Sequence, residues 1–241
     1  MPYPPTRPRP PAAAPRASRF LLRFLQHCRV GSAALLLASV AAFAPAQAAL
    51  PQPLQLNAAD KALLAKVETY LNNQQGLTAN FVQVSSDGVT RTGKAWLERP
   101  GKMRFEYNPP DKQLLVAGFG LLVYHDPELN QTTNIPLGST PLGILLAKHV
   151  DLNSGGVEVT QISRQPGEDD ITLVRKDKPA AGSLTLVFST NPLELRQWVV
   201  DDAQGQETRV SLYDIQPGGP YPNSLFQYAT SSTPIPSGGG G

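Results

Sequence analysis

The chain has 241 residues, 41% of them hydrophobic and 17% charged, and a formal net charge of +2 at pH 7. Six of its 21 basic residues, all arginines, fall within residues 1–48, where there is no acidic residue, so the rest of the chain has 15 basic and 19 acidic residues. That remainder is acidic and has no concentrated basic surface, which argues against nucleic acid as a partner.

Residues 1–48 have the pattern of a cleavable signal peptide. Their arginines precede an apolar run at about residues 33–43, which is too short to span a bilayer comfortably. Small residues at Ala46 and Ala48 suit cleavage by a signal peptidase after Ala48. The single cysteine, Cys28, lacks the small preceding residues of a lipoprotein signal, so the mature chain is expected to have no thiol for a disulfide or for catalysis.

The first expected element is an amphipathic helix that begins after Asn57, a residue type that often caps helices. Apolar residues then recur at three- and four-residue spacing, the period of a helix with one buried face. These residues are Leu56, Leu63, Leu64, Val67, Tyr70 and Leu71. Gly76 stands where a helix-terminating glycine is expected. The pattern predicts a helix that covers a sheet.

Residues 96–107 indicate a β-hairpin whose turn lies at Pro100-Gly101. Proline fixes φ for one central turn position, and glycine accepts the positive φ of the next. After the turn, apolar and charged residues alternate with the period of a strand that has one buried side. The face expected to be buried carries Met103, Phe105 and Tyr107, and the other carries Arg104 and Glu106.

From residue 77 to residue 213 the chain has the pattern of short strands separated by turn residues. The expected strands are 77–84, 91–98, 103–107, 113–117, 121–125, 130–135, 156–163, 170–175, 184–189, 195–200 and 207–213. Connections this short make neighbouring strands antiparallel. About eleven such strands with few helices predict a mainly β fold, a large curved sheet whose concave face must be covered or must hold a ligand.

Residues 138–151 interrupt the strands with a short apolar helix, expected at 141–147. Ser139 or Thr140 can cap it, and Pro141 suits its first turn. One face carries Leu142, Leu145, Leu146 and His149, with Ile144 beside them. A helix this short depends on docking for its position. The residues alone leave two interpretations open, a plug for an open end of the sheet and a movable lid.

The sequence shows no catalytic signature. It has no Gly-x-Ser-x-Gly elbow, no phosphate-binding glycine loop and no paired-histidine metal motif. Gly118-Phe119-Gly120 is interpreted as a hairpin turn. His125 and Asp126 are adjacent on an expected strand and therefore point to opposite faces, which is a poor arrangement for an acid–base pair. We expect no catalytic residue, no metal site and no cofactor.

After residue 215 the composition changes to proline and glycine and then to a Ser/Thr/Pro stretch that ends in four glycines. Such a stretch cannot bury enough apolar surface to fold. The expected organisation is a signal peptide at 1–48, a single domain at 49–228 and a disordered tail at 229–241.

A series of short motifs runs in a fixed order through residues 54–215. It comprises Phe81-Val82-Gln83, Gly88, Gly93, Trp96, Arg99-Pro100, Asn108-Pro109-Pro110, Gln113-Leu114-Leu115-Val116, Gly118, Leu122-Val123-Tyr124, Asp126 and Asn130-Gln131-Thr132. This series resembles the LolA family, the periplasmic carriers of outer-membrane lipoproteins in Gram-negative bacteria. Phe226 and Tyr228 resemble the strand that closes LolA-like chains.

The resemblance implies an incomplete antiparallel β-barrel with a helical lid over an apolar cavity. It also implies a periplasmic carrier that binds the acyl chains of lipoproteins and transfers them from the inner to the outer membrane. The expected cavity residues are Trp96, Met103, Phe105, Tyr107, Leu142, Ile144, Leu145 and Leu146. The implied partners are lipoproteins, an inner-membrane Lol ABC transporter and an outer-membrane acceptor, and the carrier is expected to be a monomer.

Arg99 is expected to latch the lid. An arginine beside a Pro-Gly turn is usually a solvated surface residue, but the Arg-Pro pair matches that of LolA-like proteins. Its five donors can satisfy several carbonyl oxygens, such as those at the end of helix 141–147. Two other functions stay open on the same fold, a LolB-like outer-membrane lipoprotein acceptor and a lipoprotein-sensing regulatory module. The missing lipoprotein signal argues against the first, and the lack of a second domain or membrane segment argues against the second.

Overall fold

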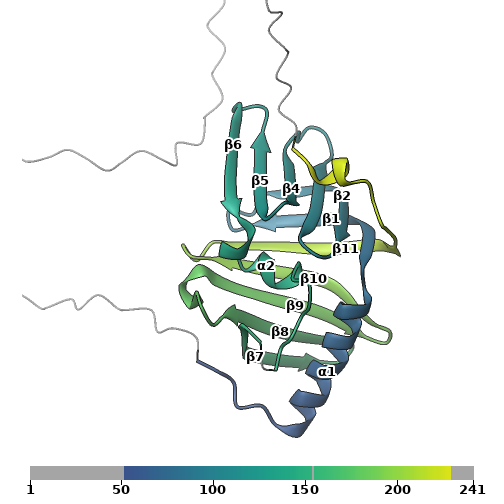
Figure 1. Ribbon diagram of the computed structural model, residues 1–241, viewed down its shortest axis with the longest axis vertical. Coiled ribbons are helices and arrows are strands. Elements are labelled where there is room, and N and C mark those ends of the chain that lie inside the picture. Colours follow the sequence, from purple (N-terminus) through teal and green to yellow (C-terminus); the bar gives the residue numbers. More distant parts are fainter. Residues whose placement is uncertain (1–51, 154, 229–241) are drawn as a thin grey trace, which may run out of the picture. The chain divides into compact units, whose positions relative to one another are not determined.

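A computed structural model describes residues 52–153 and 155–228, so the expected signal peptide and the expected disordered tail lie outside the described residues. Within these residues eleven strands form one antiparallel sheet (Figure 1). They are β1 (Gly76–Ser85), β2 (Thr90–Glu98), β3 (Lys102–Tyr107), β4 (Leu114–Gly118), β5 (Leu121–Asp126), β6 (Gln131–Pro136), β7 (Val157–Gln165), β8 (Glu168–Arg175), β9 (Gly182–Thr190), β10 (Leu193–Asp202) and β11 (Glu207–Pro217). All eleven predicted strands are present, and the prediction of a mainly β fold with an unclosed sheet is confirmed.

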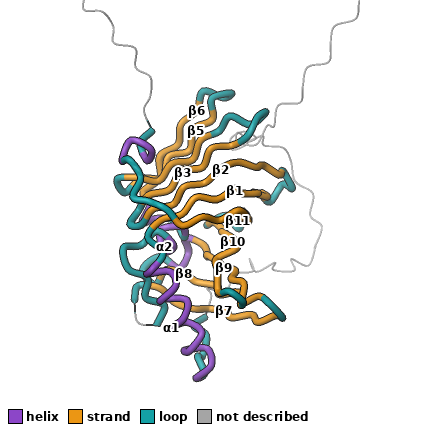
Figure 2. Tube along the Cα trace, turned by 90° about the vertical axis from the view of Figure 1, so that its right-hand side faces the viewer, coloured by secondary structure: helices purple, strands orange, loops and turns teal. Residues whose placement is uncertain are grey.

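The order of the strands explains where the short helix lies. From edge to edge the order is β6-β5-β4-β3-β2-β1-β11-β10-β9-β8-β7, so the edges are two strands that are consecutive in the chain. The link between them has to travel from one edge of the sheet to the other. It carries the 3₁₀ helix η1 (Leu137–Ser139) and α2 (Leu142–Leu145) across the face of the sheet, on the same side as α1 (Ala58–Asn73) (Figures 1 and 2).

Helix α1 begins as predicted and ends earlier than predicted. Asn57 and Asp60 form a capping box, in which each side chain accepts a hydrogen bond of 2.9 Å from the backbone N–H of the other. The bond from Asn57 lowers the pKa of Asp60 below its usual value. Gln74 follows the helix in an extended conformation, and Gly76 is the first residue of β1 rather than a helix cap. A Cβ at Gly76 would collide with the carbonyl oxygen of Gly218, which accounts for the glycine.

The C-terminal residues form a 3₁₀ helix, η3 (Asn223–Phe226), and not the closing strand that the family resemblance implied. Proline residues precede this helix and have no N–H to donate to a strand ladder. The segment lies across β3 and β4 on the face opposite to α2, where Arg104 donates to the carbonyl oxygen of Leu225 at 3.1 Å. Phe226 is 1% exposed, so the segment covers that face without extending the sheet.

The main hydrophobic core lies between the concave face of the sheet and the two α-helices. Aromatic side chains form its centre. The centroid of the Phe105 ring lies 4.5 Å from the centroid of the Phe81 ring and 5.9 Å from that of the Trp198 ring. A further 3₁₀ helix, η2 (Pro179–Ala181), joins β8 to β9. None of the helices within the described residues is long and apolar enough to cross a membrane.

Candidate functional site

Helix α2 is a single short turn, Leu142–Leu145, within the expected range 141–147. The expected caps are not used, because the Thr140 hydroxyl donates to the carbonyl oxygen of Leu137 and Ser139 accepts from Lys178 Nζ at 3.2 Å. Gly143 is required by close approach, since a Cβ there would lie 2.7 Å from the Leu137 carbonyl oxygen. His149, expected on the apolar face, lies beyond the helix and is exposed. The residues on both sides of α2 therefore form a compact, irregular connection between β6 and β7.

The apolar side chains of α2 and the residue after it are almost fully buried. Their exposed fractions are 7% for Leu142, 3% for Ile144, 3% for Leu145 and 2% for Leu146. They belong to the same core cluster as Met103 and Phe105 of β3, each 1% exposed. Tyr107 packs against this cluster, and its hydroxyl donates to Gln83 Oε1 at 2.8 Å. The structure thus brings together seven of the eight side chains expected at the cavity.

Trp96 is the exception. In the β2–β3 pair Trp96 lies opposite Arg104, whereas Leu97 lies opposite Met103. Side chains on directly opposed residues share a face, so Trp96 is on the outer face with Arg104. The Lys94 ammonium lies 5.2 Å from the centre of its ring there. The expectation that Trp96 contributes to the concave side is wrong, and the strand register is the reason.

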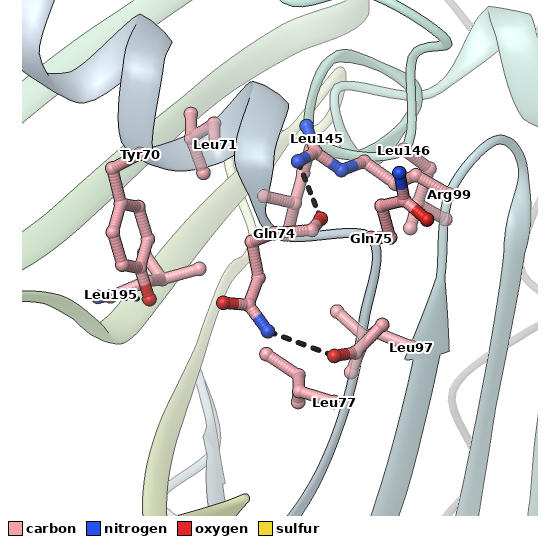
Figure 3. Close-up of a pocket in the computed structure, with 11 residues that line it drawn as sticks. Tyr70, Leu71, Gln74, Gln75, Leu77, Leu97, Arg99, Leu145, Leu146 and Leu195 are labelled. Carbon is pink, nitrogen blue, oxygen red and sulfur yellow. Dashed lines mark hydrogen bonds between the residues drawn. The ribbon is translucent and has the colours of Figure 1, made fainter. Parts of the chain in front are cut away.

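Arg99 lies in the turn between β2 and β3, and its side chain reaches the C-terminal end of α1 (Figure 3). Its Nη2 donates to the carbonyl oxygen of Gln74 at 2.7 Å, and its backbone N–H donates to that of Gln75 at 2.8 Å. The expected partner, the end of the short helix, is therefore corrected to the end of α1, whose last carbonyl groups have no partner within the helix. Burial lowers the pKa of Arg99 from its ordinary value.

Backbone and amide contacts that the sequence did not indicate hold the segment that contains α2. The backbone N–H of Gly101 donates to the carbonyl oxygen of Leu146 at 2.8 Å. The side-chain amide of Asn72, on α1, donates to the carbonyl oxygen of Val150 and accepts from its N–H, both at 2.9 Å. In the sequence, Asn72 is recognisable only as a polar residue near the end of an amphipathic helix. That position does not indicate which group its side chain binds. The link is thus fastened to both the hairpin turn and α1.

A small cavity remains where α1, α2 and the start of β1 and the end of β2 meet (Figure 3). Its volume is about 30 Å³, which holds about one water molecule. Its lining consists of Tyr70, Leu71, Gln74, Gln75, Gly76, Leu77, Leu97, Arg99, Leu145, Leu146 and Leu195. The apolar side chains of α2 and of Leu146 are almost fully buried in the core over the concave face, so the described structure is a closed arrangement.

His125 and Asp126 are engaged in separate local contacts. His125 Nδ1 lies 2.9 Å from the Tyr228 hydroxyl and 3.0 Å from Thr132 Oγ1. Asp126 Oδ1 accepts from the backbone N–H of Glu128 at 2.9 Å in the β5–β6 turn. The described part of the chain contains no group of three or more His, Cys, Asp and Glu residues that could hold a metal ion.

Comparison with known proteins finds one matching family model and several similar chains. The family model described as outer membrane lipoprotein carrier protein LolA matches residues 72–229. An outer-membrane lipoprotein carrier protein from Pseudomonas aeruginosa is 30% identical over 174 residues, which are 66% of this chain and 80% of that protein. The Azotobacter vinelandii protein of the same name is 30% identical over 197 residues, 76% of this chain and 86% of its own length. A solved LolA superfamily protein from Nitrosomonas europaea shows 10% identity and a TM-score of 0.39, and the match covers 68% of this chain and 97% of that one.

Proposed function

The chain belongs to the LolA family of outer membrane lipoprotein carrier proteins, and we propose that it shields the acyl chains of lipoproteins beneath a movable α2 lid while carrying them from the inner to the outer membrane. The observation that carries this proposal is the closed arrangement of α2. A four-residue helix with almost fully buried apolar side chains lies over a concave sheet face rich in aromatic residues. Movement of this one segment would uncover an apolar surface for a ligand.

The energies of lid and cargo are comparable. Burying the four large lid side chains contributes about 6–12 kcal/mol as an upper estimate. An acyl chain of about 16 carbons gains about 12 kcal/mol when it leaves water, at about 0.8 kcal/mol per methylene. Acyl chains can therefore displace the lid from the concave face, and the lid can displace them in return. A reversible exchange of this kind is what a carrier requires, because it must release its cargo.

The turn at residues 99–101 is proposed to set the balance between the closed and open states. Arg99 holds the turn against the end of α1, and the N–H of Gly101, in the same turn, holds the end of the lid. The bond from the Arg99 guanidinium is charge-assisted and contributes about 1.5–3 kcal/mol, whereas the bond from the Gly101 N–H joins two neutral groups and contributes about 0.5–1.5 kcal/mol. Loss of the Arg99 contact would favour the open state, so the carrier would still load but would release poorly.

The surroundings of the carrier are proposed from the family. The chain would be secreted through its signal peptide and would act as a monomer in the periplasm. An inner-membrane Lol ABC transporter would deliver the lipoproteins, and an outer-membrane acceptor would receive them. The closed form buries Phe81, Phe105 and Trp198 of the concave face together with the lid leucines, which suits a protein that must remain dispersed in water between the two membranes.

Two measurements test the carrier function. Protein purified from the periplasm of cells that express the full chain is analysed by mass spectrometry, and lipoproteins or acylated peptides are expected to copurify. Met103→Glu is then compared with Lys94→Glu for binding of a fluorescent fatty-acyl probe. Glutamate at Met103 would place a charge on the concave face and should abolish binding, whereas exposed Lys94 on the outer face should tolerate it. Equal binding by the two variants would refute the assignment of the concave face.

A further inference from the structure

The guanidinium of Arg99 has one buried nitrogen, Nη1, without a hydrogen-bond partner in the described structure. Two neighbouring polar side chains, those of Gln74 and Tyr70, are already engaged. Arg99 Nη2 donates to the Gln74 carbonyl oxygen, and the Gln74 amide donates to the carbonyl oxygen of Gly76 at 2.8 Å. The Tyr70 hydroxyl accepts from the N–H of Leu195 at 3.2 Å. Leaving a buried donor of a charged group unpaired costs free energy. We therefore expect Nη1 to have a hydrogen-bond partner in another state of the protein.

This nitrogen belongs to a side chain that lines the cavity under the lid. Leu145 and Leu146 form the lid side of that cavity, and the remaining apolar lining comes from α1 and the sheet (Figure 3). Displacement of these two leucines would join the cavity to the concave face. Arg99 is fastened to the end of α1 and not to α2, so it can keep its place when the lid moves.

We propose that Arg99 Nη1 donates a hydrogen bond to an ester carbonyl oxygen of the acylated cargo, at the point where an acyl chain joins its glyceryl group. This inference rests on the proposed carrier function. The hydrocarbon part of an acyl chain has no hydrogen-bond acceptor. The acceptor nearest to the hydrocarbon is the ester carbonyl oxygen, so this oxygen would be the first acceptor to enter an apolar cavity with the chain. Nη1 is the guanidinium nitrogen of Arg99 that is buried without a partner, and a single carbonyl oxygen is enough to pair it.

The site would therefore recognise the ester linkage itself, in addition to the hydrocarbon. Two synthetic probes separate these contributions. One is a cysteine peptide with a dipalmitoylglyceryl group on its sulfur, and the other is the same peptide with dihexadecyl ethers in place of the esters. The ether probe has chains of matching length and no carbonyl acceptor. Affinities of both probes are measured for the wild-type chain and for Arg99→Met.

For each protein we take the ratio of its affinity for the ester probe to its affinity for the ether probe. This ratio is expected to be roughly ten- to hundredfold higher for the wild-type chain than for Arg99→Met, as the loss of one charge-assisted hydrogen bond predicts. The ratio of the two affinities cancels any general effect that loss of the Gln74 contact has on the lid. Arg104→Met is the matched control, because Arg104 lies in the same hairpin on the outer face, and it should keep the wild-type ratio.

An unchanged ester-to-ether ratio in Arg99→Met would overturn the inference while leaving the carrier function intact. A wild-type chain that binds neither probe would overturn the carrier function, and the inference with it. Palmitate is measured alongside, and a loss of affinity in Arg99→Met confined to palmitate would assign Nη1 to a carboxylate and exclude the ester.

A second measurement does not depend on how well the variant folds. An ester probe labelled with ¹³C at its carbonyl carbons is bound to the wild-type chain and followed by infrared spectroscopy. A carbonyl that accepts a hydrogen bond from a guanidinium absorbs at lower frequency than one in an apolar medium. We expect one carbonyl band to shift in this direction on binding, and carbonyl bands that all stay at the apolar position would also overturn the proposal.

Discussion

The backbone nitrogen of Gly101 lies 2.8 Å from the carbonyl oxygen of Leu146, and this hydrogen bond joins the turn of the β2–β3 hairpin to the residue that follows α2. Gly101 adopts a φ of +73°, a conformation that L side chains rarely take. The turn that ends one strand of the sheet thus also fixes the position of α2. Its geometry depends on one glycine.

We predict that Gly101→Ala speeds uptake of an acyl probe, because strain in the turn weakens the bond to Leu146. Gly88→Ala is the matched control, since Gly88 has a φ of +79° in the β1–β2 turn and makes no such bond. Both substitutions should lower the free energy of unfolding by about 1 kcal/mol. Stopped-flow fluorescence measures uptake, and identical rates in the two variants would show that the Gly101 bond does not restrain the lid.

A second prediction concerns the competition between lid and ligand. Leu146→Ala should lower the free energy of unfolding of the empty protein by about 2–5 kcal/mol. The same change should raise the affinity for an acyl probe, because a smaller lid competes less well for the concave face. Val187→Ala removes volume from a buried position outside the concave core and should leave affinity unchanged. A Leu146→Ala variant that binds the probe more weakly than wild type would refute the competition.

The third prediction uses the contact between Glu98 and the C-terminal segment. Glu98 accepts from the N–H of Tyr221 and from Lys102 Nζ, both at 2.6 Å. Burial by itself would raise the pKa of Glu98, but these donors hold it below the ordinary value of 4.5. A lowered folded-state pKa contributes stability above the unfolded pKa, and that stability is lost as the pH falls through the folded value.

We therefore expect Glu98→Gln to lower the free energy of unfolding by about 1–3 kcal/mol at neutral pH. The difference from wild type should shrink as the pH falls through the glutamate range, which urea unfolding at a series of pH values measures. Glu106→Gln is the control, because Glu106 is an exposed partner of Arg104 and such pairs contribute about 0–1 kcal/mol. A Glu98→Gln deficit that is the same at neutral and acidic pH would exclude this titration as its origin.

The fourth prediction concerns Phe119 in the β4–β5 turn. Phe119 is 74% exposed and has a φ of +51°, a conformation that is rare for a bulky residue. Asparagine tolerates this conformation better, so Phe119→Asn should raise the free energy of unfolding by about 0.5–1 kcal/mol. Leu129→Asn changes a residue that is 71% exposed in the next turn without a positive φ, and its effect should stay within about 0.5 kcal/mol. Equal effects in urea unfolding would show that the backbone of Phe119 is not strained.

Local patterns in the sequence were sufficient for the strands and for part of the site. Alternation after Pro100-Gly101 placed Met103 and Phe105 on the buried face, and the capping pattern placed the start of α1. The sequence also contains enough information to infer on which face of the sheet Trp96 lies. A turn at residues 99–101 pairs Glu98 with Lys102, and from that register Trp96 must share a face with Arg104.

Other features depend on which elements meet in three dimensions. The guanidinium of Arg99 can satisfy any free carbonyl group within its reach, and only the packing of α1 against the sheet decides that Gln74 is its partner. Phe226 and Tyr228 resemble the strand that closes LolA-like chains, yet the C-terminal residues form a 3₁₀ helix and a loop on the outer face. Resemblance to a family implied a helix over the concave face, and it did not indicate the contacts that hold this helix.

The open edge between β6 and β7 has a consequence for the size of the cargo. In a closed barrel, the number and stagger of the strands fix the diameter. Here the edge strands β6 and β7 are not hydrogen-bonded to each other, so no closed ring of strand pairs fixes the width of the concave space. Small changes of twist at every strand pair can widen that space without breaking a ladder. Under the proposed carrier function, an unclosed sheet would let the same chain accommodate cargo that differs in its number of acyl chains.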